Sequence, residues 1–293
     1  MKFTLILATI NTDINKIERF LDSLNNQTYR NFELIIVDQN DDERLKEIVG
    51  KFSQVFPIIH LRSTQGLSRS RNVGLRYARG DIISFPDDDC WYPVNLLEQI
   101  AQFLQTHSDI DGLTGRVIDE NENPSAGRFD TTSGFINRFN VWRRGWSISM
   151  FLRSNVIKVV GDFDETLGAG AGTPWGSGEE TDYLLRALNH GFRLYYNPNI
   201  SVYHPHPVEK CHNAKALLKR AIAYSCGMGY VLRKHQYPVR FLAYWELRSL
   251  VGILIGLIQM DKVKVLTHCG NVIGRLRGWR GGSVCKEKHV FRA

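Results

Sequence analysis

Several patterns that would assign a class to a chain of 293 residues are missing from this one. The five cysteines are an odd number and include no Cys-x-x-Cys pair. This argues against a disulfide framework or a zinc site and is typical of reduced thiols in the cytoplasm. No secretory signal is expected, because the residues after Met1 run directly into a strand-like segment. No internal repeat is evident.

Long hydrophobic runs are also missing from the carboxyl-terminal part, where helices are expected at 213–233 and from Pro238 onward. In the second of these helices the longest stretch without a charged residue is 249–260, which is twelve residues. Spanning a bilayer takes about 20 apolar residues. We therefore expect this region to pack on the rest of the chain or to lie in a membrane interface, and not to cross the membrane.

Charge is distributed unevenly along the chain, although the net charge is only +7. Residues 206–293 hold eight lysines and eight arginines against four acidic residues, a net charge of +12, so the remainder carries −5. An apolar fraction of 43% is enough for a sizeable core, in one large domain or in a domain with an appendage. The contrast between an acidic body and a basic tail predicts that the tail meets an anionic surface.

The first ninety residues or so alternate between strand-like and helix-like segments. Strands are expected at 3–8, 32–37, 57–61 and 82–85, with helices between them at 14–24, 43–52 and 66–78. This order predicts a mostly parallel sheet covered by helices on both faces. Further along we expect helices at 93–106, 154–160 and 183–189, strands at 111–117, 146–152, 192–196 and 200–203, a long loop at 119–145 and a Gly-rich segment at 168–178.

Three adjacent carboxylates follow the strand at 82–85. Asp87, Asp88 and Asp89 repel one another, and a hard divalent cation with oxygen ligands would offset that repulsion. The alternative is a solvated acidic turn before the next helix. Because the carboxyl ends of the strands in an open α/β sheet converge on one crevice, these groups predict a site for a metal, a diphosphate and a carboxylate base. Other acidic or histidine groups fall at Asp38, at 179–182, and at His204 and His206.

Six segments are informative when taken together in their order and spacing: Thr9-Ile10-Asn11, Ile36-Val37-Asp38, GLSRSRNVG at 66–74, GDIISF at 80–85, Asp87-Asp88-Asp89 and GEETD at 178–182. They resemble the family 2 glycosyltransferases with the GT-A fold over roughly residues 1–207. The resemblance implies an α/β nucleotide-diphospho-sugar transferase fold with a mostly parallel, Rossmann-like sheet, and transfer of a sugar from a sugar nucleotide to a hydroxyl with inversion. It divides the chain into a nucleotide-sugar-binding half at 1–110, an acceptor-binding half at 111–207 and a helical extension at 208–293.

The resemblance also implies roles for individual residues on the donor side. Thr9 and Asp38 would hold the nucleoside, and Arg71 would lie beside its base. Asp89 would be the direct ligand of the metal, Mn²⁺ or Mg²⁺, and His204 would lie at the metal or the diphosphate. Asp87 and Asp88 belong to the same Asp-x-Asp motif, which implies contact with the sugar nucleotide.

On the acceptor side, Glu180 aligns with the catalytic aspartate of the family. This chain has Glu-Glu where the family commonly has Glu-Asp, so Glu179 remains a competitor for the role of base. Trp175 would stack on a sugar ring. Structural alternatives stand beside three assignments: Arg71 as a solvated residue of a basic helix face, His204 as a hydrogen-bonded core histidine, and Trp175 as a core anchor.

The expected function is that of a metal-dependent inverting glycosyltransferase in cell-surface or exopolysaccharide synthesis. Asp38 with Arg71 suits the edge of a pyrimidine, so the donor is expected to be a UDP-sugar, with a dTDP-sugar as the alternative. The acceptor would be a glycan or a lipid-linked glycan. Further partners would be an anionic membrane surface or a second copy of the chain, but no nucleic acid. The enzyme would be cytoplasmic, or peripheral on the inner face of the cell membrane.

Two competing interpretations remain open from the sequence. A sugar-nucleotide pyrophosphorylase would need a Gly-rich loop with a basic residue after the first strand, where this chain has Thr9-Ile10-Asn11-Thr12. A protein that binds a sugar nucleotide or a glycan without turning it over would be favoured by loss of the acidic motifs, and both motifs are present.

Overall fold

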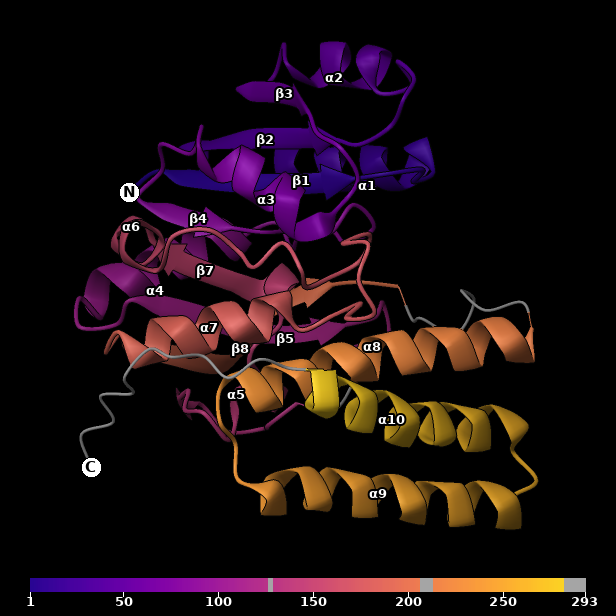
Figure 1. The fold of residues 1–293 in the computed structure, drawn as a ribbon. Helices are drawn as coiled ribbons and strands as arrows, with labels where there is room; N and C mark the ends of the chain where they lie inside the picture. The colour runs from indigo at the N-terminus through magenta and orange to yellow at the C-terminus, as the bar shows by residue number, and fades with distance from the viewer. Residues whose placement is uncertain (126–128, 206–212, 282–293) are drawn as a thin grey trace. The chain divides into compact units, whose positions relative to one another are not determined.

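The computed structural model describes residues 1–125, 129–205 and 213–281, and the chain divides into two compact units. The first unit comprises 1–65, 69–163 and 183–207. The second comprises 66–68, 164–182 and 208–293. The helices and strands of both units are labelled in Figure 1. A segment from the middle of the chain, 164–182, thus belongs to the same unit as the carboxyl-terminal helices.

An eight-stranded sheet organises the first unit, with the strand order β3-β2-β1-β4-β7-β5-β8-β6. One half is parallel and consists of β3 (Ile58–Arg62), β2 (Phe32–Asp38), β1 (Phe3–Thr9) and β4 (Ile82–Ser84). In the other half β5 (Gly112–Ile118) and β8 (Leu194–Tyr203) are parallel, while β7 (Met150–Arg153) and β6 (Gly134–Phe135) run antiparallel to their neighbours. The first four strands therefore end at one edge, which places the loops after β1, β2 and β4 together.

Helices cover both faces of this sheet, as predicted. On one face α1 (Ile14–Asn25), α2 (Lys46–Phe52) and α4 (Leu96–Thr106) share an apolar cluster with Leu5 of β1. On the other face lies α3 (Leu67–Leu75), where a Cβ added to Gly74 would come within 2.4 Å of the Ile6 side chain. Leu5 and Ile6 are both fully buried, because successive side chains of a strand point to opposite faces. Asp13 caps α1 by accepting a hydrogen bond from the N–H of Asn15.

Several elements differ from the sequence-based expectation. The loop expected at 119–145 contains β6 and the short helix α5 (Val141–Arg144), and the strand expected at 146–152 is a 3-10 turn (Ser147–Ser149) followed by β7. The two strands expected at 192–196 and 200–203 form one strand, β8, whose pairing with β5 is irregular between Thr114 and Arg116. Pro198, which has no N–H to donate to a neighbouring strand, lies between the two registers of β8. The helix α6 (Ser154–Val160) lies where it was predicted.

Three long helices form the main part of the second unit: α8 (Ala214–Lys234), α9 (Val239–Ile258) and α10 (Lys262–Gly281). Helix α10 packs against both α8 and α9 (Figure 1). A Cβ at Gly274 would lie 2.3 Å from the carbonyl oxygen of Ile222, and one at Gly278 only 1.9 Å from that of Cys226. The backbones of α8 and α10 therefore touch, and glycines spaced four residues apart permit this close approach.

Helix α9 begins immediately after Pro238, as the sequence predicted. It extends well beyond the twelve-residue run on which the expectation of no membrane crossing was based. By length and composition this 20-residue helix could cross a membrane, and only 22% of its most apolar window is buried.

Candidate active site

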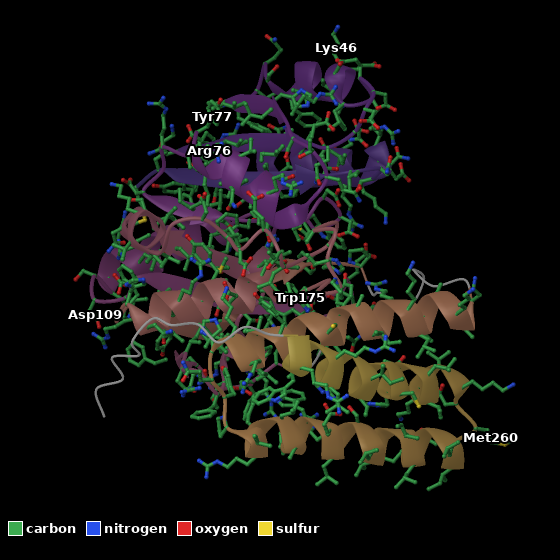
Figure 2. The ribbon with its side chains drawn as sticks, in the orientation of Figure 1. Lys46, Arg76, Tyr77, Asp109, Trp175 and Met260 are labelled. Carbon is green, nitrogen blue, oxygen red and sulfur yellow. The ribbon has the colours of Figure 1, made fainter. Side chains whose placement is uncertain are left out.

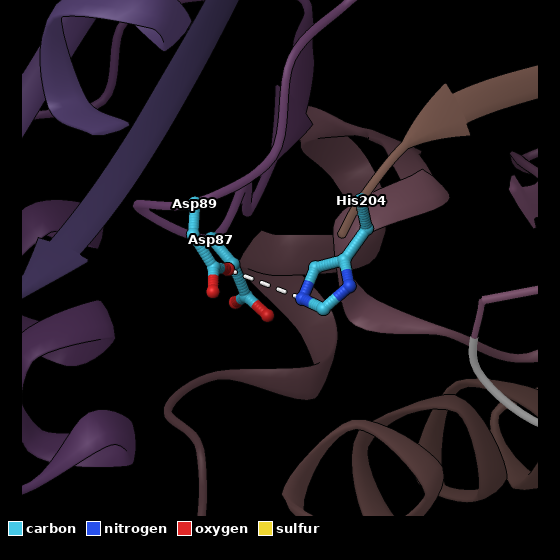
Figure 3. Close-up of side chains that lie close together, drawn as sticks. All are labelled: Asp87, Asp89 and His204. Carbon is cyan, nitrogen blue, oxygen red and sulfur yellow. Dashed lines mark ion pairs between the residues drawn. The ribbon is translucent and has the colours of Figure 1, made fainter. Parts of the chain in front are cut away.

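A compact cluster of two carboxylates and an imidazole lies at the carboxyl end of β4 (Figure 3). Asp87 and Asp89 follow β4, and His204 follows β8. The Nε2 atom of His204 lies 3.1 Å from Oδ1 of Asp89, and one ligand atom of each residue lies within 4.8 Å of the others. Asp89 is 9% exposed. The structure thus brings together Asp89 and His204, which the sequence predicted for the metal, and Asp87, which it predicted for the sugar nucleotide.

The backbone positions these groups in a way that the sequence pattern did not reveal. Trp91 and Tyr203 exchange two backbone hydrogen bonds of 3.0 Å, and their rings stack with centroids 5.5 Å apart. The N–H of His204 then donates to the carbonyl oxygen of Ile118. Its Nδ1 atom is buried and has no hydrogen-bond partner among the described residues. The segment after β4 is therefore tied to the end of β8, and this tie directs the histidine toward the carboxylates.

The charges in this cluster are unbalanced. Loss of water around the carboxylate, followed by the neighbouring charges of Asp89 and Asp88, raises the pKa of Asp87 to about 6, while Arg71 and His204 oppose the shift. A divalent cation would reverse this effect, because it favours the ionised form of every carboxylate beside it. Two carboxylates and one imidazole that converge on a common point are a suitable donor set for such a cation.

Arg71 lies beside Asp87, and its surroundings differ from the expectation. Its side chain is 1% exposed, with a guanidinium nitrogen 3.6 Å from the carboxylate of Asp87. The guanidinium carbon lies 5.7 Å from the ring centre of Phe85 and 5.5 Å from that of Phe163. The alternative of a solvated basic helix face is wrong for this residue. The helix expected at 66–78 is also shorter than predicted, because α3 ends at Leu75 and leaves Arg76 outside it.

A pocket of about 740 Å³ opens where β1, β2 and β3 end. Asn11, at the pocket, has a positive φ of 53° and donates its N–H to the side chain of Asn40. Beside it, Thr12 donates a short hydrogen bond to Asp88, so the pocket rim is joined directly to the aspartate cluster. The pocket is lined by Ile10, Asn11, Gln39, Asn40, Asp41, Arg62, Ser63, Thr64 and Gln65.

Thr9 and Asp38 lie beneath this pocket and are buried, at 1% and 0% exposure. The carboxylate of Asp38 is fully engaged by protein groups. One oxygen accepts from the N–H and the side-chain amide of Asn40, at 2.9 and 2.7 Å. The other lies 3.1 Å from Nε2 of His60 and 3.0 Å from the guanidinium of Arg62. A carboxylate has about four acceptor positions, and these four contacts account for them. Asp38 therefore supports the pocket from below by holding two residues of its lining, Asn40 and Arg62.

Sequence reasoning missed Asn40 and Arg62, which do line the pocket. Arg62 donates to the carbonyl oxygens of Asn40 and Asp42, at 2.5 and 2.8 Å, and to Glu43 at 2.9 Å, so it holds the loop after β2 in place. Asp38 and Arg62 are partners in the register of the parallel strands β2 and β3, and this pairing is the signal that would have identified Arg62. That signal requires the strand register, which spacing along one chain does not provide.

The acidic motif predicted on the acceptor side forms the first turn of α7 (Glu179–Asn189), and does not precede the helix as expected. Glu179 is buried at 5% exposure, and a Cβ added to Gly168 would lie 3.1 Å from its carboxylate. Glu180 is partly exposed. Asp182 is fully buried and lies 2.8 Å from Lys234 and 2.8 Å from His235, both at the end of α8.

Trp175 belongs to the same unit, in the Gly-rich segment before α7 (Figure 2). Its ring stacks on Tyr230 of α8, with the ring centres 4.0 Å apart. Tyr230 therefore covers one face of the indole, and Trp175 remains partly exposed. Its role toward a sugar stays a prediction, as do the roles of the other residues of the site. His206 lies outside the described residues.

The fold is similar to that of two proteins whose structures were solved in complex with a nucleotide sugar. S. aureus TarS 1–349 in complex with UDP-GlcNAc has a TM-score of 0.62 at 16% identity, covering 96% of this chain and 93% of that one. The mannosyltransferase PcManGT from Pyrobaculum calidifontis in complex with GDP-Man and Mn²⁺ has a TM-score of 0.66 at 15% identity, covering 94% and 86%.

Residues 4–158 match the family described as Glycosyl transferase family 2, and the chain belongs to this family. Glycosyltransferase AglE of Haloferax volcanii is 24% identical over 265 residues, which are 87% of this chain and 82% of AglE. The chain spans only about a third of the length of other curated relatives. The predicted family, the GT-A fold with its helical carboxyl-terminal part, and glycosyltransferase activity are confirmed.

Proposed function

We propose that this glycosyltransferase is metal-dependent and inverting, and that it moves a sugar from a nucleotide-diphosphate donor to a hydroxyl of a glycan or lipid-linked acceptor in cell-surface polysaccharide synthesis. The observation that carries the proposal is the convergence of Asp87, Asp89 and His204 at the end of β4. The solved neighbours support a nucleotide-sugar donor, because TarS holds UDP-GlcNAc and PcManGT holds GDP-Man with Mn²⁺.

Asp89 and His204 would hold the cation, with Asp87 as a further ligand. An imidazole among the ligands favours Mn²⁺ over Mg²⁺, since Mg²⁺ prefers oxygen donors in near-ideal octahedral geometry. When bound, the cation would offset the negative charge that develops on the departing diphosphate. Arg71 would add a buried positive charge beside Asp87, and Asp88 would contact the ribose or the sugar.

The pocket at the ends of β1–β3 would receive the nucleobase. Its polar lining offers donors and acceptors to a base edge, and its connection through Thr12 to Asp88 would allow a diphosphate to reach the cation. A UDP-sugar is the first candidate donor and a dTDP-sugar the second, since the two bases differ by one methyl group. In this arrangement Asp38 would act from beneath the pocket by holding Asn40 and Arg62. Thr9 would act there by accepting hydrogen bonds from Gln39 at its carbonyl oxygen.

Glu180 would act as the general base. It would take the proton of the acceptor hydroxyl as that oxygen forms a bond to the anomeric carbon. The bond from that carbon to the diphosphate oxygen would break, and its electron pair would leave with the nucleoside diphosphate. The partial exposure of Glu180 supports Glu180 as the base over Glu179, which is buried against Gly168. Trp175 would support the acceptor or donor sugar at its exposed edge.

A nucleotide-release assay tests the proposal, with a panel of UDP-, dTDP- and GDP-sugars and with Mn²⁺, Mg²⁺ or excess chelator. Release should require the cation and should be strongest with one uridine donor. Asp89→Ala should lose release while remaining folded. The matched control is Asp109→Ala, an exposed acidic residue that pairs with Arg193 just before the start of β8, at the opposite end of that strand from His204. Full activity of Asp89→Ala, or of the wild type in excess chelator, would remove the metal from the proposal.

We place the enzyme in the cytoplasm, with its basic carboxyl-terminal region facing the inner surface of the cell membrane. The charge of +12 over residues 206–293 supports this location, because basic residues near an anionic leaflet are attracted to it. A lipid-linked acceptor would be presented at the same surface. A contact between two copies of the chain is the alternative use of these helices.

A further inference from the structure

The face of α9 directed away from α10 is a continuous apolar surface. Leu247, Leu254 and Ile258 are 62%, 60% and 82% exposed, and Met260, just after the helix, is 89% exposed (Figure 2). In an α-helix, residues three and four positions apart share a face, so these side chains form one stripe. The other members of the stripe are Tyr244, Leu250, Val251 and Leu257, all at least 46% exposed.

The opposite face of α9 is committed to α10. Arg275 of α10 donates to Glu246 at 2.9 Å and to Ser249 at 2.6 Å. One turn further along α9, a Cβ at Gly252 would collide with the ring of His268, and one at Gly256 with Val265. As the residue number rises on α9 it falls on α10, so the two helices are antiparallel and in contact along most of their length.

This pairing decides against a membrane crossing by α9. Helix α10 would have to enter the bilayer beside it, and α10 carries Lys264 near its start and Arg275 and Arg277 in its second half. The uncharged stretch between Lys264 and Arg275 is about 15 Å long at 1.5 Å per residue, about half of the hydrocarbon thickness. A helix that lies along the surface leaves these charges in water.

The charge of the three helices is suited to an anionic surface. Residues 213–281 contain twelve lysines and arginines and only two acidic residues, Glu246 and Asp261. Glu246 is paired with Arg275, and Asp261 accepts the backbone N–H of Lys264. Basic residues flank the apolar stripe at both ends of α9, with Arg240 in its first turn and Lys262 and Lys264 just beyond its end, and Arg248 adds a charge midway along the helix.

We propose that α9 docks on an anionic lipid surface and lies in its plane, with the apolar stripe among the outer parts of the acyl chains and α10 on the water side. This is an interfacial amphipathic helix, with apolar area for insertion and flanking cations for the headgroups. The purpose of this docking would be to hold the enzyme beside a lipid-linked acceptor, and this part of the proposal rests on the proposed function.

Vesicle flotation of the full chain tests the docking, with phosphatidylcholine alone and with phosphatidylcholine mixed with phosphatidylglycerol. The double variant Leu250→Asp/Leu254→Asp places charges on the stripe at two positions that are 50% and 60% exposed. The matched control, Val55→Asp/Val159→Asp, changes two valines that are 46% and 53% exposed in the first unit. We expect the wild type and the control to float with the anionic vesicles and the double variant to bind at least about tenfold less.

A second measurement separates lying in the plane from crossing. A fluorescent amino acid is placed at Leu250, in the middle of α9, or at Met260, at its end, and is quenched by lipids brominated at different depths. Shallow quenching at both positions is expected. Deep quenching at 250 with shallow quenching at 260 would overturn the orientation in favour of a spanning helix.

Two further results would overturn the docking itself. Equal flotation of the double variant and the wild type would mean that charge alone binds the vesicles. A wild type that ignores anionic vesicles and forms a dimer, which the double variant disrupts in light scattering, would assign the stripe to a second copy. Nucleotide release from a soluble donor needs no membrane, so its retention in the double variant distinguishes failure of docking from failure of the proposed function.

Discussion

The ammonium of Lys234, at the end of α8, lies 2.8 Å from a carboxylate oxygen of Asp182, in the first turn of α7. The same ammonium lies 2.7 Å from Asp164, and the ring of His235 approaches Asp182 to 2.8 Å. Asp182 is fully buried. The carboxyl-terminal helices therefore hold the turn that carries Glu179 and Glu180.

Replacing Lys234 with methionine should leave two carboxylates without their cation. Burial disfavours the ammonium, but the two carboxylates outweigh this, and the pKa of Lys234 is raised. Breaking such a buried pair by removing one partner costs about 3 kcal/mol of unfolding free energy. Chemical denaturation measures this loss. Arg233→Met, which removes an adjacent exposed charge above Trp279, should cost less than about 1 kcal/mol. Equal losses in the two variants would show that the Lys234 pairs add nothing.

The stabilisation from this pair should disappear in acid. Burial acts to raise the pKa of Asp164, but the hydrogen bonds from Lys234 and Thr166 outweigh it, so the pKa is lowered. A carboxyl group whose pKa is lower in the folded state contributes stability above its unfolded pKa, near 4, and loses it as the pH falls through the folded value. The difference in unfolding free energy between wild type and Lys234→Met should thus be constant from about pH 6 to 9 and shrink below about pH 4. A difference that grows in acid would contradict this assignment.

Asp87→Asn should raise the melting temperature of the metal-free protein at pH 7.5, and this gain should shrink as the pH falls from about 6 toward 4. The reason is the raised pKa of Asp87, about 6: the cost of ionising this carboxyl in the folded state begins above its unfolded pKa, near 4, and is complete above about pH 6. Because 38% of the side chain is exposed, solvent screening limits the gain to about 1 kcal/mol. Scanning calorimetry in excess chelator measures it. Addition of Mn²⁺ should reverse the order, since the wild type gains a ligand that the variant lacks. A lower melting temperature at pH 7.5 would refute the unfavourable charge.

Glu180→Gln should lower turnover by about 10²–10⁴-fold with little change in donor binding, because the amide keeps the shape of the side chain but cannot accept the proton. Glu179→Gln is the internal control and should retain most of the turnover. Steady-state kinetics with the best donor, together with calorimetric binding of the nucleotide, separates the two effects. The reverse pattern, with Glu179→Gln inactive, would assign the base to the buried residue.

Arg62→Met should weaken binding of the free nucleotide about tenfold, which is about 1.4 kcal/mol. Its guanidinium holds Asn40, Asp42 and Glu43 along one side of the pocket, and without it this loop must be ordered by the ligand. Arg44→Met is the matched control, because Arg44 pairs with Asp42 on the surface and does not line the pocket. Isothermal titration with UDP compares the two. Unchanged affinity in Arg62→Met would place the nucleotide elsewhere.

Local sequence determined much of the first unit. The strands at β1, β2, β3 and β4 lie within one or two residues of their expected positions, because each is a short apolar run bounded by polar residues. Asp13 and Pro238 mark helix starts through their own backbone chemistry. The aspartates after β4 were identifiable because three like charges in sequence require a partner that offsets them.

Tertiary structure alone decided the contacts between distant segments. The approach of His204 to Asp89 depends on the bridge between Trp91 and Tyr203, and the engagement of Asp38 by Arg62 depends on the register of parallel strands. The antiparallel orientation of β7, the burial of Arg71 and the pairing of α9 with α10 likewise follow from packing. Hydrophobic periodicity specifies which face of an element is buried, but the partner of that face is selected by shape and charge across the whole fold, which no local pattern encodes.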